Sequence, residues 1–122
     1  MKHKIFINYP IDDCAVENLR KNTPDLFATQ NGEEVLAMAR NGDVERVCIA
    51  FGALSFSEFE IMEAIHKIDP TIPILVLSSE IPSNIHRNEY ITTNVGFFIE
   101  SINEFLNGGL TEEDYSFFSR VV

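Results

Sequence analysis

Residues 46–78 read RVCIAFGALSFSEFEIMEAIHKIDPTIPILVLS, and this stretch decides the fold. Two apolar runs, Arg46–Ala50 and Ile72–Ser78, are typical of strands that are covered on both faces. The segment between them carries apolar residues at the spacing of one helix face, after a serine that can cap the first turn. The connection is long enough for a crossover helix, so the stretch predicts two parallel strands joined by a helix that ends before Pro70. The apolar helix positions are Phe59, Ile61, Met62, Ile65 and Ile68, and the capping candidates are Ser55 and Ser57.

The same alternation continues on both sides of this stretch. Three further β-prone runs are Lys4–Asn8, Asp25–Thr29 and Val95–Glu100. Helical segments separate or follow these runs, and polar residues stand where each helix would begin. The order predicts an α/β domain with a doubly wound, five-stranded parallel sheet. The predicted helix starts are Asp12-Asp13, Asn31-Gly32, Ser83 for a short helix to Tyr90, and Ser101 for a helix over Ile102–Asn107.

Beyond Asn107 the pattern changes. Gly108-Gly109 interrupts the helix, and Thr111 followed by Asp114 predicts a new start. We therefore expect residues 1–107 to form one domain and residues 108–122 to form an extra C-terminal helix. That helix could dock a partner or a second copy, fold back onto the domain, or lead into another domain. Its apolar residues are Tyr115, Phe117, Phe118, Val121 and Val122.

Charge and cysteine content exclude several classes of protein. With 19 acidic and 9 basic residues among 122, the net charge is −10, which disfavours nucleic acid and anionic membranes as partners. The apolar patch Ile5–Ile7 is too short for a signal peptide, and no run approaches the about 20 residues of a membrane span. Cys14 and Cys48 lack the spacing of a zinc or redox motif. We expect a cytoplasmic protein with reduced thiols.

Enzymatic motifs are not found in the sequence. No glycine-rich phosphate-binding loop follows any predicted strand, and the histidines are dispersed. Neither a metal-binding set nor a Ser–His–Asp set can be assembled. We therefore expect a protein that is not an enzyme and has no cofactor.

From Lys4 to about Asn107 the chain resembles the receiver domain of bacterial two-component response regulators. The best local match is FEIMEAIHKIDPTIPILVLSS, Phe59–Ser79, and NGEEVLAMAR, Asn31–Arg40, is similar to the second helix of that family. The resemblance implies a CheY-like (flavodoxin-like) fold and a role in phosphorelay signal transduction.

The resemblance also implies a phosphorylation site at the carboxyl ends of the strands. Receivers carry an acidic pair after the first strand, a phosphoacceptor Asp after the third, a Ser or Thr after the fourth and a Lys after the fifth, with a switch aromatic in the fifth. Only the hydroxyl and the aromatic are kept here. The corresponding residues are Tyr9, Pro10, Ala50, Ser78, Glu100 and, for the aromatic, Phe97.

The departures remove the chemistry of phosphotransfer. The methyl group of Ala50 cannot act as a nucleophile, and Tyr9 and Pro10 offer no carboxylate for magnesium. Glu100 would add negative charge where the family has positive charge. The sequence therefore predicts a pseudo-receiver that works without phosphorylation and without magnesium. We expect it to bind a protein partner or a second copy through Asn84–Asn107 and the C-terminal helix.

Three alternatives stay open. Asp12 and Asp13 could be the acidic pair, shifted along the chain in a phosphorylatable regulator, although capping and surface charge explain them more simply. The strand-end pocket could instead hold a neutral or cationic small molecule. An enzyme of another doubly wound family, such as a hydrolase, needs a nucleophile–base pair that the sequence does not nominate. The expected pocket lining is Tyr9, Ala50, Phe51, Ser78 and Glu100.

Overall fold

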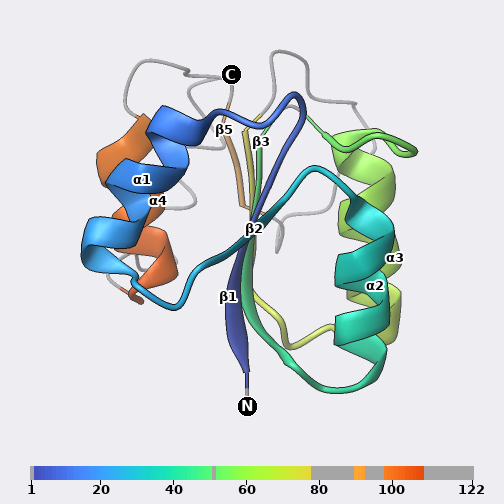
Figure 1. Cartoon of the computed structure of the whole chain (residues 1–122). Helices are drawn as coiled ribbons and strands as arrows, with labels where there is room; N and C mark the ends of the chain where they lie inside the picture. The colour runs from blue at the N-terminus through green and yellow to red at the C-terminus, as the bar shows by residue number, and fades with distance from the viewer. Residues whose placement is uncertain (1, 51, 78–89, 93–97, 109–122) are drawn as a thin grey trace.

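The computed structural model describes residues 2–50, 52–77, 90–92 and 98–108. These residues form a parallel sheet with the strand order β2-β1-β3-β4-β5. Helices cover both faces: α1 and α4 lie on one side of the sheet and α2 and α3 on the other (Figure 1). The predicted α/β class with a parallel sheet is confirmed. The elements are β1 His3–Asn8, α1 Asp13–Asn22, β2 Phe27–Thr29, α2 Gly32–Arg40, β3 Val44–Ala50, α3 Glu58–Ile68, β4 Ile74–Leu77, β5 Tyr90–Thr92 and α4 Phe98–Leu106.

The central strands divide the core into two layers. Successive side chains of a strand point to opposite faces, so Ile5 and Ile7 of β1 face α2 and α3, whereas Phe6 faces α1 and α4. Each layer is closed by the apolar stripe of its helices. The layer of α2 and α3 contains Val35, Leu36, Ile61, Met62 and Ile65, and the opposite layer contains Val16, Leu19, Ile102, Phe105 and Leu106.

Three helices begin at the polar residues that the sequence predicts. Asp12 caps α1 by accepting from two backbone N–H groups, and Asn31 caps α2 in the same manner with one. Ser57, one of the two serines considered, caps α3 through the N–H of Glu60. Each cap satisfies backbone donors that would otherwise have no acceptor in the first turn.

The prediction of a fifth strand at Val95–Glu100 is wrong at Phe98–Glu100, and residues 95–97 lie outside the described residues. The strand beside β4 is Tyr90–Thr92, and Glu100 lies inside α4, which begins at Phe98 rather than after a cap at Ser101. A short continuous apolar run fits a buried strand or a buried helix equally well, so periodicity could not separate the two. Burial of Ile102, Phe105 and Leu106 against α1 and β3 stabilises the helix.

The end of α4 agrees with the predicted break after Asn107. Gly108 has a positive φ of 77°, which favours glycine, and its N–H donates to the carbonyl of Phe105 at 3.1 Å. The short helix predicted from Ser83 conflicts with the structure at its last residue, because Tyr90 begins β5, and residues 83–89 lie outside the described residues.

The predicted C-terminal helix also falls outside the described residues, together with Tyr115, Phe117, Phe118, Val121 and Val122. Its division from the domain therefore stays a prediction. In the described part of the chain, no helix has the length and apolar character that crossing a membrane requires.

Candidate functional site

Asn8, the last residue of β1, organises the carboxyl edge of the sheet. It lies opposite Ala50, the last residue of β3, and only 4% of its surface is exposed. Its Nδ2 donates to the carbonyl oxygen of Ala50 at 3.0 Å, and its Oδ1 accepts from the backbone N–H of Asp12 at 3.0 Å. One buried side chain therefore joins β1, β3 and the start of α1.

The carboxylate of Asp12 is used by the helix that follows. Its Oδ1 accepts from the N–H of Cys14 at 3.0 Å and from that of Ala15 at 3.2 Å. A negative charge in this position also interacts favourably with the partial positive charge of the helix N-terminus. Asp12 is thus a structural cap, as the simpler interpretation of the sequence predicts.

A second side chain supports the loop between β1 and α1. Gln30, just after β2, accepts from the backbone N–H of Ile11 through Oε1 at 3.3 Å, and its own carbonyl accepts from the N–H of Leu54 at 2.9 Å. The loops after β1 and β3 are thereby held to the end of β2. Tyr9 and Leu54 lie in these two loops and are exposed by 41% and 53%.

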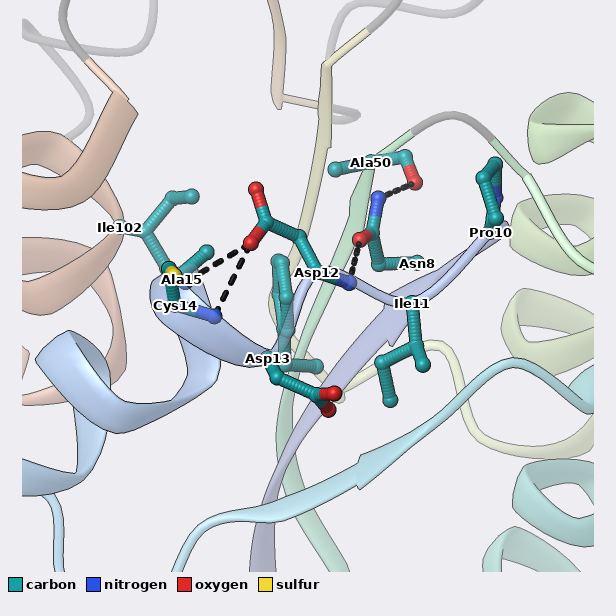
Figure 2. A pocket seen from close by; sticks show the side chains of 10 residues that line it. Asn8, Pro10, Ile11, Asp12, Asp13, Cys14, Ala15, Ala50 and Ile102 are labelled. Carbon is teal, nitrogen blue, oxygen red and sulfur yellow. Dashed lines mark hydrogen bonds between the residues drawn. The ribbon is translucent and has the colours of Figure 1, made fainter.

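A cleft of about 570 Å³ opens at this edge of the sheet, between the first turn of α1 and α4 (Figure 2). The exposed Asp12 and Asp13 supply negative charge to it, and none of the described residues that line it is basic. Most of the wall is apolar. The lining residues are Phe6, Asn8, Pro10, Ile11, Asp12, Asp13, Cys14, Ala15, Ala50 and Ile102.

The expected site residues are only partly brought together. Ala50 ends β3, as expected, and it is buried, with 3% of its surface exposed. Pro10 lines the cleft, whereas Tyr9 does not and is largely exposed. The placement of Glu100 at the end of the fifth strand is wrong, because this residue is in α4.

Several expected residues lie beyond the part of the chain that the structure describes, namely Phe51, Ser78 and Phe97. Conversely, the sequence analysis did not identify Asn8 as a site residue. The sequence did contain a pointer to Asn8, because this amide ends an otherwise apolar strand run. A buried amide side chain must find hydrogen-bond partners. Its partners could not be inferred without the register of β1 against β3.

The two cysteines differ in environment. Cys48 is fully buried in β3, and burial raises the pKa of its thiol well above the usual range. Cys14 is exposed in the first turn of α1, on the rim of the cleft. Within the described residues, no group of three or more His, Cys, Asp or Glu side chains is arranged to hold a metal ion.

Comparison with solved structures identifies the same architecture elsewhere. The chemotaxis response regulator CheY4 of Vibrio cholerae superimposes with a TM-score of 0.63 at 17% sequence identity, over 90% of this chain and 100% of that one. No family model and no curated protein matches the sequence. At this level of identity the likeness concerns the fold alone. The chain therefore has the α/β fold of a CheY-type receiver domain.

Proposed function

We propose that this chain is a signalling domain of the two-component type that binds a protein partner without being phosphorylated. The receiver fold supports the signalling role, since a comparable structure belongs to a chemotaxis response regulator. The site at the carboxyl ends of the strands supports the second half of the proposal. Fold alone does not determine function, so the argument depends on that site.

The end of β3 is the observation that carries the proposal. Acyl phosphate chemistry needs a carboxylate nucleophile, and the residue that ends β3 is Ala50. The side chain facing it from β1 is the neutral amide of Asn8, which is itself held by two hydrogen bonds. Neither group can attack phosphorus, and neither supplies the negative charge that attracts magnesium.

The nearby carboxylates do not replace the missing acid. Asp12 already accepts two backbone hydrogen bonds through Oδ1 as the cap of α1, and these bonds hold its carboxylate at the start of the helix. Asp13 is exposed at the first position of the helix. Among the residues that the structure describes, no lysine or arginine lines the cleft to balance a phosphoryl group. Phosphotransfer at this edge is therefore disfavoured for two reasons: the described residues offer neither a suitable nucleophile nor a positive charge.

The first test is direct phosphorylation. The protein is incubated with acetyl phosphate and magnesium and read by intact mass, with a response regulator that acetyl phosphate labels as the positive control. We expect no phosphoryl adduct on this protein under conditions that label the control. An adduct that disappears in Asp12→Asn or Asp13→Asn would show that one of these residues is the acceptor and would overturn the proposal.

The second test concerns the interaction. We place the binding surface on Asn84–Asn107 and the C-terminal segment, with Tyr115, Phe117, Phe118 and Val121 as its apolar contacts. Sedimentation velocity over a range of concentrations measures self-association of the full chain, and Phe118→Ser is expected to weaken any dimer. If neither self-association nor a partner that depends on these side chains is found, the interaction role is wrong.

A further inference from the structure

The cleft between α1 and α4 has the dimensions of a small-molecule site. Its volume of about 570 Å³ falls inside the range of about 300–1,000 Å³ that is usual for ligand pockets. It also lies outside the carboxyl ends of parallel strands, where ligands of open α/β sheets bind. From its lining we infer that it binds a small organic cation, an ammonium group attached to one apolar body such as an aromatic ring.

The floor and the walls fit the apolar body. Phe6 and Ala50 come from the sheet, and Ile102 comes from α4, each at most 3% exposed. These groups offer no hydrogen bond, so a polar ligand would lose its water contacts there without replacement. Ile11 and Ala15, both partly buried, add further apolar surface to the lining.

The polar groups fit the ammonium head. Asp12 uses only Oδ1 for capping, and Oδ2 accepts no hydrogen bond from any described residue. Asp13 is a second carboxylate among the lining residues, although its side chain points away from the carboxylate of Asp12 (Figure 2). An ammonium group supplies the donors that these oxygens lack, and its positive charge is attracted by both.

Asn8 gives the cleft a further unfilled polar position. Its side chain is more than nine-tenths buried, and its Nδ2 donates one of two hydrogens to Ala50. The second hydrogen has no acceptor among the described residues, although Asn8 lines the cleft. A ligand with a hydroxyl or ether oxygen near its ammonium group would satisfy this donor.

Charge argues against the opposite class of ligand. The described part of the lining contains two carboxylates and no basic residue, and the whole chain carries a net charge of −10. An anion such as phosphate would be repelled both locally and at long range. The inference therefore separates this cleft from a phosphoryl site. It is also independent of the partner binding proposed above, since a ligand can bind whether or not a partner does.

The test uses 2-phenylethylammonium as the probe, with 2-phenylethanol and 3-phenylpropanoate as neutral and anionic analogues of similar shape. Each is titrated into ¹⁵N-labelled protein at constant ionic strength. We expect the ammonium probe to shift the side-chain amide of Asn8 and the backbone amides of Cys14 and Ala15 saturably. The alcohol should bind more weakly, and the carboxylate should not bind.

Matched variants assign the effect to the cleft. Asp12→Asn keeps a capping oxygen but removes the charge, and in combination with Asp13→Asn it should weaken the ammonium probe by about fivefold to tenfold. Glu17→Gln removes a charge from the exposed side of the same helix and should change affinity by less than about twofold. Ala15→Leu adds bulk to the lining and should weaken the binding of the ammonium and alcohol probes alike.

Three outcomes would overturn the inference. The first is an absence of saturable shifts at Asn8, Cys14 and Ala15 with the ammonium probe. The second is equal weakening by Glu17→Gln and by the Asp12 and Asp13 variants, which would mean that only the general negative charge acts. The third is binding of the carboxylate as strong as that of the ammonium ion. Circular dichroism of each variant verifies that the fold is retained.

Discussion

The side-chain amide of Asn8 donates a hydrogen bond of 3.0 Å to the backbone carbonyl of Ala50, so a buried side chain joins the ends of β1 and β3. Replacing Asn8 by Leu keeps a similar size but removes this donor and the acceptor for the N–H of Asp12. We expect Asn8→Leu to lower the free energy of unfolding by about 1–3 kcal/mol, since two backbone groups lose their partner. Urea denaturation measures the change.

A second substitution at Asn8 should make the stability of the protein depend on pH. In Asn8→Asp, an ionised carboxylate would face the carbonyl oxygen of Ala50, so burial and repulsion should raise the pKa of the introduced carboxyl in the fold. The loss of stability relative to the wild type should therefore grow as the pH rises above the unfolded-state pKa of about 3.9 and vanish below it. A difference between the two proteins that is independent of pH would contradict this arrangement.

Close packing of α2 against α3 depends on Gly32. A Cβ at this position would overlap the Cδ1 end of the Ile61 side chain and lie 3.3 Å from the Cβ of Ala53, so the fully buried Ile61 would have to shift. Alanine normally stabilises a helix relative to glycine, but here we expect Gly32→Ala to destabilise the protein by about 1–3 kcal/mol through overpacking. Urea denaturation of the two proteins measures the difference.

A double-mutant cycle tests that cause. Ile61→Val removes the Cδ1 atom that a Cβ at Gly32 would meet. The double variant should therefore be more stable than the sum of the two single effects predicts, by about 1 kcal/mol. Strict additivity would mean that the cost of Gly32→Ala has another origin.

The two thiols should differ in reactivity. Cys48 is buried, and burial raises the pKa of its thiol, which disfavours the reactive thiolate, whereas Cys14 is exposed. With an aromatic disulfide reagent we expect one thiol to react in the folded protein and the second to react only in denaturant. Cys14→Ser should abolish the reaction of the folded protein. If Cys48 in the folded protein were labelled as fast as Cys14, its burial in the fold would be contradicted.

Arg46 of β3 holds the last turn of α4. Its Nη1 donates to the carbonyl of Phe105 at 3.2 Å, and its guanidinium carbon lies 5.4 Å from the centre of the Phe105 ring. Arg46→Met keeps the apolar stem and removes both interactions, so we expect a loss of about 1–2 kcal/mol in the free energy of unfolding. The exposed Arg40 provides the control, and an equal effect of Arg40→Met would show that charge alone matters.

Asp69, which follows α3, offers a local pH probe. The hydroxyl of Thr71 donates to its carboxylate at 2.6 Å, and this bond and that of the Thr71 N–H hold the pKa of Asp69 below its usual value. Any stability from this lowered pKa is present above the unfolded-state pKa and is lost as the pH falls through the folded value. In Thr71→Val the pKa of Asp69 should rise toward its usual value in an NMR titration, and an unchanged pKa would exclude the hydroxyl as the main cause.

Much of the fold could be predicted from short stretches of sequence. The caps at Asp12, Asn31 and Ser57 begin their helices as expected, and the run Arg46–Ala50 lies within a buried strand. These features are local, since a cap acts within one helical turn and burial on both faces needs only a few apolar residues in succession. The strand prediction failed at Phe98–Glu100, which lie in a helix, because a short apolar run has no period that distinguishes strand from helix.

The sequence by itself determined the alternation of strands and helices from β1 to β4, the parallel sheet and the methyl group at the end of β3, because each depends on neighbouring residues or on the length of a crossover. Only the tertiary structure decided that Asn8 meets Ala50, 42 positions away, and that α1 and α4 border one cleft. Both facts depend on the register and packing of distant segments. Register and packing are set by contacts between segments that are far apart in the sequence, so no single segment determines them.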